Sequence, residues 1–424
     1  MDRAGRRAYH PSGFEISDFR SQIDGHGVSA APICNLKSQF SNPQRVPAVS
    51  LRRILVLSAS AGGGHLRAAE AVEAAWRRLR PDAEVRHVDT LTLTPAPFRR
   101  VYGKGYLDLV NVAPDLLGIL YDRTNRPPRH PLMEKLRIAI DRLNTRPFVK
   151  FVLDFAPDLI CHTHFLSAMI VAHQKAKHGR IPAPHAVVVT DFEVHRFWLC
   201  PGADRYFVAR EENRVHLAAL GVDPGIVRST GIPVDPVFAE TPDLPALRKK
   251  HGVAEGKPLL LVLCGGFGVG PIEALVESLW KSVRGAQLAI VTGRNEKLRA
   301  SLTRKAEDAP IPTQVLGFTK EMHEWMALAG LAVTKPGGLT TSEALARGLP
   351  LVVVNPIPGQ ETRNATMLFE SGAAITGENP LTVGWRVAQL LPDPARLAAM
   401  RQAAKSLGRP RAAYDIVEEL AGLA

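Results

Sequence analysis

Two side chains suited to moving protons stand where short apolar runs of this chain end. His65 closes the sequence SASAGGGH after the apolar residues 54–57, and Asp191 follows the apolar residues 186–189. A side chain at the carboxyl end of a buried parallel strand faces the place where such sheets bind their ligands. We therefore expect His65 to act as a general base or to hold an acceptor, and Asp191 to act as a base or to orient one.

Three glycine-rich segments come directly before predicted helices. They are residues 58–65, 265–270 and 335–343, and a helix N-terminus reached through such a turn offers free N–H groups to an anion. Residues 265–270 read GGFGVG, which is not the dinucleotide pattern GxGxxG, and the chain contains no GxxxxGK[ST] pattern typical of ATP cleavage. We therefore predict diphosphate binding, with Glu343 in the first helical turn placed to accept from ribose hydroxyls.

Sugar recognition is predicted in residues 356–365, which read PIPGQETRNA after a buried apolar run. Amides and carboxylates at a strand end are suited to sugar hydroxyls. Plain structural interpretations stay open for each of these segments: a tight turn with His65 as a helix cap, an acid at Glu343 that complements the helix dipole, and an ordinary polar helix start at 356–365.

Divalent metal binding has little support in the sequence. His162 and His164 form an HxH pair without an evident third ligand, and Asp191 with Glu193 is the one acidic pair that resembles a metal site of sugar-nucleotide enzymes. The chain contains no DxD triplet, and its four cysteines show no CxxC spacing. We predict no metal and no cofactor, and a reducing compartment.

Alternation of strands and helices predicts an α/β fold with doubly wound parallel sheets. We expect strands at residues 54–58, 159–161, 186–189, 206–208, 259–263, 288–292, 315–318, 332–334 and 351–354. We expect helices at residues 66–79, 167–177, 211–220 and 341–347, the last ending at Gly348. A chain of 424 residues exceeds what one core usually supports, which predicts two domains.

The domain limits follow from composition. Residues 1–50 are polar and aperiodic, which indicates a disordered lead-in, while their acidic residues argue against a transit peptide. The Pro- and Gly-rich residues 230–236 separate a domain at 51–235 from one at 236–424. The helical stretch after Pro394 could lie across both domains.

The net charge of +12 predicts an anionic partner. Residues 95–150 contain eleven Lys or Arg and five Asp or Glu, so half of the excess, +6, lies in this stretch among apolar and aromatic residues. That mixture suits an anionic bilayer surface, although a solvated helical face has similar residues. No nucleic-acid-binding signature accompanies it, and no apolar run is long enough to span a membrane.

Taken in order, these segments resemble the monogalactosyldiacylglycerol synthases and processive diacylglycerol glycosyltransferases, in the family 28 glycosyltransferases. The resemblance covers residues from about Arg53 to about Ala373. It rests on SAGGGH at 60–65, VTD at 189–191 with His195 and Trp198, GGFG at 265–268, KPGGLT at 335–340 with Glu343, and GQE at 359–361 with Asn364.

The resemblance implies the GT-B fold, with two facing Rossmann-like domains. It places a UDP-sugar in the C-terminal domain, held by Gly265, Gly266, Phe267, Gly268, Phe318, Lys335, Gly338, Leu339, Thr340, Glu343, Gln360, Glu361 and Asn364. In the N-terminal domain it places the acceptor at Gly63, Gly64, His195 and Trp198. His65, His164 and Asp191 become the catalytic candidates, and which of them is the base stays open.

The implied activity is inverting, metal-independent transfer of galactose or glucose to diacylglycerol by a peripheral protein on the cytoplasmic face of a membrane. Arg363 departs from the family pattern, which usually has glycine there, so the sugar is left open. The alternatives are a related transferase acting on a peptidoglycan precursor or a sterol, and a non-catalytic lipid-binding protein of the same fold.

Overall fold

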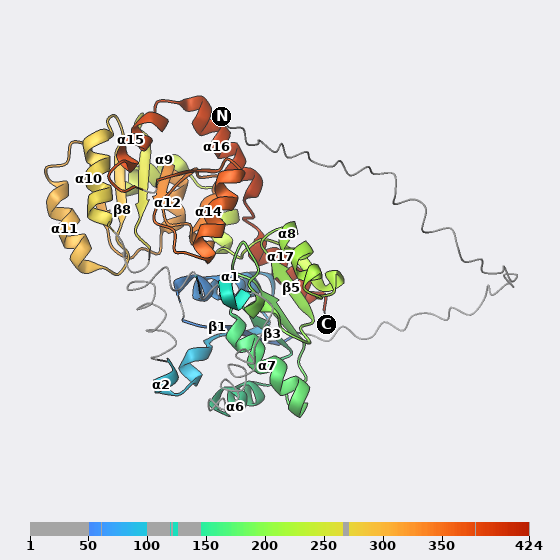
Figure 1. Ribbon diagram of the computed structural model, residues 1–424. Coiled ribbons are helices and arrows are strands. Elements are labelled where there is room, and N and C mark those ends of the chain that lie inside the picture. The colour runs from blue at the N-terminus through green and yellow to red at the C-terminus, as the bar shows by residue number, and fades with distance from the viewer. Residues whose placement is uncertain are drawn as a thin grey trace, which may run out of the picture. The chain divides into compact units, whose positions relative to one another are not determined.

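The computed structural model describes residues 51–60, 62–99, 119, 122–125, 146–265, 271–377 and 379–423. They form two six-stranded sheets (Figure 1). The first contains β1 (Arg53–Ser58), β2 (Glu84–Asp89), β3 (Leu159–His162), β4 (His185–Val188), β5 (Arg205–Val208) and β6 (Val227–Ser229). The second contains β7 (Leu259–Leu263), β8 (Gln287–Val291), β9 (Thr313–Leu316), β10 (Ala329–Thr334), β11 (Leu351–Val353) and β12 (Ala374–Thr376).

Both sheets are parallel throughout, and both reverse their strand order near the middle. The first has the order β2-β1-β3-β4-β5-β6, with register pairs such as Leu57 with His162. The second has the order β12-β11-β10-β7-β8-β9, with Leu263 paired to Thr334. A parallel doubly wound sheet binds ligands at the strand carboxyl ends beside such a reversal. The reversals lie between β1 and β3 and between β7 and β10, and these four strands precede His65, His164, Gly265 and Lys335.

Helices connect the strands, as parallel pairing requires. In the first half they are α1 (Gly63–Leu79), α2 (Ala96–Arg99), α6 (Arg146–Phe155), α7 (Phe165–His178) and α8 (Glu211–Ala219). In the second half they are α9 (Leu244–His251), α10 (Ile272–Ser282), α11 (Glu296–Ala306), α12 (Met322–Leu328), α13 (Gly338–Ala346), α14 (Gln360–Glu370), α15 (Val383–Leu390), α16 (Pro394–Leu407) and α17 (Ala412–Ala421). None of the helices in the described ranges is long and apolar enough to cross a membrane.

The final helix, α17, packs on the first sheet although it follows the second in the chain. Ile416 and Leu420 are fully buried in one cluster with Trp76 of α1 and with residues of β1. An ion pair of 3.1 Å joins Glu419 to Arg228 of β6. In Figure 1 this red helix lies beside α8 and β5 of the first half. The assignment of residues 51–235 and 236–424 to two domains remains a prediction.

The predicted α/β class with two doubly wound parallel sheets is confirmed, and the errors in the predicted strands fall at the sheet edges. Three strands that were not predicted, β2, β6 and β12, are all edge strands; in β2, for example, exposed Glu84 and Arg86 flank buried Val85. Central strands are buried on both faces and appear as apolar runs, whereas edge strands carry polar residues. The strand predicted at 315–318 is β9, and it lies two residues earlier, at Thr313–Leu316.

Helix starts were also predicted too late. We expected α1 from residue 66 and α13 from residue 341, but both begin three residues earlier, inside their glycine segments. Gly63, Gly64 and His65 therefore form the first turn of α1 rather than a loop. Gly348 follows the end of α13 with φ +61°, as its predicted capping position requires.

Candidate active site

His65 is held in one tautomer by a contact with a backbone carbonyl, beside a second contact with a side-chain hydroxyl. Its Nδ1 lies 3.1 Å from the carbonyl oxygen of Thr163 and 2.8 Å from Oγ1 of Thr190. Because a carbonyl oxygen can only accept, Nδ1 carries the proton and Nε2 keeps its lone pair. Burial lowers the pKa of His65 to about 4, against the raising effect of the Thr163 bond. At neutral pH the ring is therefore an uncharged acceptor at Nε2.

His164 is held in the opposite tautomer. It caps the N-terminus of α7, and its Nδ1 accepts a 3.0 Å hydrogen bond from the backbone N–H of Leu166. Neutral His164 must then carry its proton on Nε2. Its ring lies edge-on to His65 with 4.6 Å between centroids, and burial together with nearby His65 holds the pKa of His164 well below its usual range. His164 is therefore placed as a helix cap and hydrogen-bond donor.

Asp191 lies in the loop that follows β4, where its carboxyl group contacts the indole of Trp198. Its Oδ2 accepts a 3.1 Å hydrogen bond from the Trp198 indole N–H, and both side chains are buried. Oδ1 is buried without a hydrogen-bond partner among the described residues. Burial raises the pKa of Asp191 to about 7, although the Trp198 bond opposes the shift. Trp198 in turn has its ring 6.2 Å from the ring of His65.

His195, predicted to bind the acceptor, has a visible structural role. It begins the short helix η4 (Arg196–Trp198), where its Nδ1 accepts from the backbone N–H of Phe197 at 3.1 Å. Its Nε2 lies 3.2 Å from Oγ1 of Thr124. The ring thus links the turn that carries Trp198 to the helical residues 122–125.

The Asp191 carboxyl should make stability depend on pH. The native state keeps a proton on Asp191 up to about pH 7, whereas the unfolded chain loses it near pH 4, so ionisation costs stability as pH rises through this range. Asp191→Asn keeps an acceptor for Trp198 and cannot ionise. We expect the free energy of unfolding of the variant, relative to the unmodified protein, to increase by about 2–3 kcal/mol between pH 5 and pH 8.

Urea unfolding at the two pH values measures this difference, and the other titrating groups cancel in the comparison. A difference between the two proteins that is the same at pH 5 and pH 8 would show that Asp191 is ionised across the whole range.

The start of α13 combines free backbone donors with a buried acid. The helix begins after Gly337, and no side chain of the described residues caps it. Glu343 is buried, and its Oε1 accepts a 2.7 Å hydrogen bond from Arg67 of α1. Burial raises the pKa of Glu343 to about 6, with Arg67 opposing the shift. The site therefore offers an anion the helix dipole and N–H groups. Glu343 was predicted in the first helical turn, but because α13 begins at Gly338 it lies in the second turn.

The start of α14 is organised around Glu361 and Asn364. Gln360 is the first residue of the helix and is half-buried. Oε2 of Glu361 accepts a 2.8 Å hydrogen bond from the backbone N–H of Ile357. Asn364 is fully buried, and its amide donates to the carbonyl oxygen of Pro336 at 2.9 Å. Asn364 thus ties α14 to the turn before α13.

The helix starts of the two halves meet directly. A Cβ atom added to Gly338 would lie 2.5 Å from the backbone oxygen of Thr190, and one added to Gly64 would lie 3.9 Å from Cβ of Leu339. Thr190 also contacts His65. Thr190 therefore contacts both His65, the proposed base, and the uncapped start of α13.

The remaining predicted donor residues differ in their placement. Phe318 is 56% exposed, with the guanidinium of Arg294 5.2 Å from its ring centroid. Gly265 is exposed at the end of β7, whereas Leu339 is buried and Lys335 and Thr340 are half-buried. Gly266, Phe267 and Gly268 lie outside the described residues, as does most of the basic stretch 95–150.

Two contributors to the site were not predicted. Thr163 accepts a hydrogen bond from His65. In the sequence it stands between His162 and His164, and this HxH pair was considered only as a metal site. Arg67 pairs with Glu343, yet from the sequence it is one more charged residue on a helix. Both act through contacts between distant parts of the chain, and no local pattern reveals such contacts.

One group of three side chains in the described ranges has metal-binding geometry. It consists of His251, Glu321 and Glu324, whose ligand atoms lie within 4.8 Å of one another. Nζ of Lys250 lies 2.9 Å from Glu321 and 2.7 Å from Glu324. A cation there would have to displace this ammonium group. Both carboxylates are thus already paired with Lys250, and we assign them no ligand.

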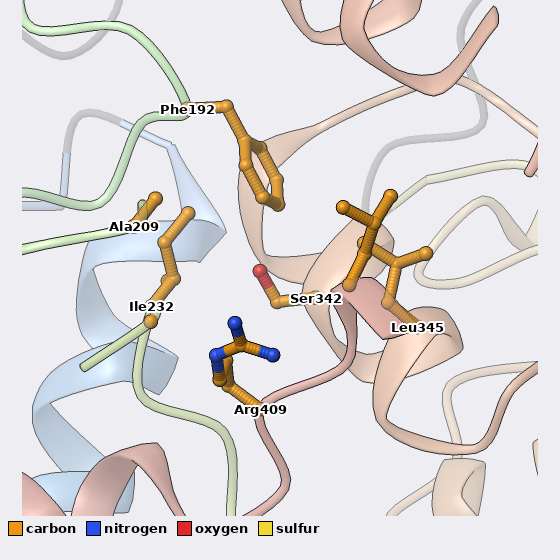
Figure 2. Close-up of a pocket in the computed structure, with 8 residues that line it drawn as sticks. Phe192, Ala209, Ile232, Ser342, Leu345 and Arg409 are labelled. Carbon is orange, nitrogen blue, oxygen red and sulfur yellow. The ribbon is translucent and has the colours of Figure 1, made fainter. Parts of the chain in front are cut away.

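A small, largely apolar pocket lies where the chain crosses between the two sheets (Figure 2). Ile232 lines it from the outgoing crossing, Ser342 and Leu345 from α13, and Arg409 from the returning crossing. The two crossings touch, because a Cβ added to Gly231 would lie 2.5 Å from Cβ of Arg409.

Two parallel α/β halves joined at such a crossing, with their helix starts in contact, define the GT-B class of glycosyltransferase folds. Solved structures support this class. Acinetobacter baumannii MurG has a TM-score of 0.57 and 16% identity, covering 88% of this chain and 100% of that one. Anabaena HepE in complex with UDP has a TM-score of 0.51 and 16% identity, covering 87% and 100%.

The family follows from sequence comparison. Residues 65–234 match the model of monogalactosyldiacylglycerol (MGDG) synthase, and residues 259–416 match the glycosyltransferase family 28 C-terminal domain. The processive diacylglycerol beta-glucosyltransferase of Bacillus pumilus is 33% identical over 62% of this chain and 68% of its own. That of Staphylococcus saprophyticus is 29% identical over 88% and 93%. The chain belongs to this family of monogalactosyldiacylglycerol synthases and diacylglycerol glucosyltransferases.

Proposed function

We propose that this enzyme transfers a hexose from a UDP-sugar to diacylglycerol and so makes a membrane glycolipid. The observation that carries the proposal is the meeting of His65 with the start of α13 through Thr190. It sets a neutral imidazole, with a free lone pair at Nε2, beside an uncapped helix start suited to an anion, in a family whose named members act on diacylglycerol. These family matches do not favour a peptidoglycan precursor, a sterol or a non-catalytic lipid-binding role.

The proposed reaction is a single displacement. Nε2 of His65 takes the proton of the acceptor hydroxyl while its oxygen bonds to the anomeric carbon. The bond from that carbon to the diphosphate breaks on the opposite face, and UDP leaves with the electron pair, which inverts the configuration. The free N–H groups at the starts of α13 and α14 stabilise the charge that grows on the leaving diphosphate.

The donor is proposed to lie along the strand ends of the second half. Residues 265–268, Gly338, Leu339 and Thr340 would hold the diphosphate, with Lys335 adding positive charge. Glu343 would hold the ribose, and Gln360 with Glu361 would hold the sugar. Phe318 would lie near the uracil. Asn364 is assigned a positioning role because its side chain is buried against Pro336.

The acceptor is proposed to enter from the first half. Gly63 and Gly64 would allow its headgroup to approach the start of α1, and Trp198, held by Asp191, would line the entrance. We further propose that the basic stretch 95–150 docks the enzyme on anionic lipid at the cytoplasmic face of a membrane. The partners would then be a UDP-sugar, diacylglycerol and an anionic bilayer, with no nucleic acid involved.

A direct assay tests this proposal. The full chain is incubated with vesicles containing diacylglycerol and with labelled UDP-glucose or UDP-galactose, with and without chelator. We expect lipid-soluble label from at least one donor, at a rate that chelation leaves unchanged. Absence of labelled lipid with both donors would overturn the transferase proposal, and loss of activity on chelation would overturn metal independence.

Vesicle composition tests the membrane proposal separately. Anionic vesicles should support faster transfer than zwitterionic ones, and the advantage should shrink as salt rises. Equal rates on both vesicle types would refute anionic docking without affecting the assigned reaction.

A further inference from the structure

Arg363 spans the gap between the two halves. It lies in the first turns of α14, two residues after Glu361, and its guanidinium reaches two carboxylates of the first half. One is Glu193, two residues beyond Asp191, and the other is Oδ1 of Asp122 at 3.0 Å. A planar guanidinium with five donors can hold two acids at once, which lysine cannot do as well.

The acidic partners are themselves anchored on the acceptor side. Asp122 opens the helical residues 122–125, in which Thr124 contacts His195 at 3.2 Å. In the same turn Oδ1 of Asn125 accepts from the backbone N–H of Arg196 at 3.0 Å. Arg363 therefore joins α14 to the loop of Asp191 and to a turn that contacts η4.

The strength of this link suits a reversible contact. The side chains of Arg363, Glu193 and Asp122 are 35%, 30% and 55% exposed, so water and salt screen both ion pairs. Such partly exposed pairs contribute modestly and do not hold two domains together permanently. They can shift an equilibrium between open and closed forms by a small factor.

We propose that Arg363 is a positioning residue that favours the closed form during transfer. By drawing α14 toward the Asp191 loop, it places the sugar ligands Gln360 and Glu361 opposite the acceptor and excludes water from the activated sugar. This inference rests on the proposed function. It adds that the balance between transfer to lipid and hydrolysis of the donor depends on an ion-pair clasp, defined as Arg363 with Glu193 and Asp122.

The test is a double-mutant cycle of Arg363→Met and Glu193→Gln, with labelled UDP-sugar and diacylglycerol vesicles. Each single variant should lower kcat for lipid transfer about fivefold and raise the ratio of free hexose to glycolipid by a similar factor. The double variant should be no worse than Arg363→Met, because that substitution already removes the contact with Glu193. The kcat of Arg363→Lys should lie between those of Arg363→Met and the unmodified protein, because lysine can pair with one of the two carboxylates.

Three controls make the cycle decisive. Arg77→Met removes an arginine whose 2.8 Å partner, Glu73, lies on its own helix, and it should leave kcat and the hydrolysis ratio unchanged. Raising salt from 50 to 500 mM should shrink the gap between the unmodified protein and Arg363→Met. Thermal unfolding should occur at similar temperatures in all variants, which separates closure from stability.

Contrary outcomes are equally clear. If the effects of the single variants multiply in the double one, or if Arg363→Met keeps the original hydrolysis ratio, the clasp is refuted. If the unmodified protein makes no glycolipid, the proposed function fails, and small-angle scattering then tests the clasp without turnover. A radius of gyration at low salt that is equal in the unmodified protein and Arg363→Met would refute it.

Discussion

His65→Asn should lower kcat for lipid glycosylation by about 10²- to 10⁴-fold while leaving the fold intact. The asparagine amide can occupy the place of Nδ1–H and keep the 3.1 Å hydrogen bond to the carbonyl oxygen of Thr163. What it lacks is the lone pair at Nε2. The variant therefore removes the proton acceptor without removing the contact that orders the first turn of α1.

The matched control is the same substitution at His164. An asparagine there can still cap α7 by accepting from the Leu166 N–H, as asparagine commonly does at this position. We expect His164→Asn to lose less than tenfold in kcat, because Nε2 of His164 already carries a proton. A larger loss in His164→Asn than in His65→Asn would reverse the assignment of the two rings.

The pH dependence of the unmodified enzyme distinguishes His65 from Asp191 as the base. With His65 near pKa 4, the base is free at neutral pH, and kcat/KM should be flat between pH 6 and pH 8. With Asp191 near pKa 7, activity should fall as pH drops through 7, because a protonated carboxyl cannot accept. A profile with its midpoint near pH 7 would therefore assign the base to Asp191.

Gly338→Ala should reduce activity by about 100-fold or more. The added Cβ would lie 2.5 Å from the backbone oxygen of Thr190, and a backbone atom cannot move aside as a flexible side chain can. The start of α13 must then shift away from Thr190 and His65, and displacements of about 1 Å in an active site can cost this much. The cost in stability should be about 1–3 kcal/mol, as for other overpacked sites.

The neighbouring glycine provides the control. A Cβ on Gly337 would meet only Oε1 of Glu361, at an ordinary contact distance of 3.7 Å, and its backbone φ of −64° suits alanine. Gly337→Ala should therefore retain activity within a few fold. Kinetics of both variants with diacylglycerol vesicles measure the difference, and equal activities would show that the two halves do not approach this closely during turnover.

The fold was predictable where a buried element appears in the sequence as a continuous apolar run. The strand β7 matches its predicted range, and the other central strands differ from theirs by a few residues at most, because a strand buried on both faces needs an unbroken apolar run. The edge strand β2, with the sequence EVRHVD, faces water on one side and gave no such signal.

The site was predictable as a set of residues but not as a set of contacts. Glycines, His65, Asp191 and Glu343 stood out because strand ends and helix starts have local signatures. The tautomer of His65 depends on Thr163, which is 98 residues away, and Glu343 accepts its hydrogen bond from Arg67, which is 276 residues away. Nor did the sequence show that Arg363 pairs with Glu193 across the two halves. Such pairings exist only after the two halves have packed.

The position of α17 has a consequence for the order in which the chain becomes stable during synthesis. Domains usually fold from the N-terminus as the chain is made. Here the core around β1 and Trp76 includes Ile416 and Leu420, so it cannot be completed until nearly the whole chain has left the ribosome. The apolar face of the first half that α17 covers therefore stays exposed while the second half is translated. A nascent chain halted after residue 407 would therefore be cleaved by proteases most readily in the first half, around β1 and Trp76.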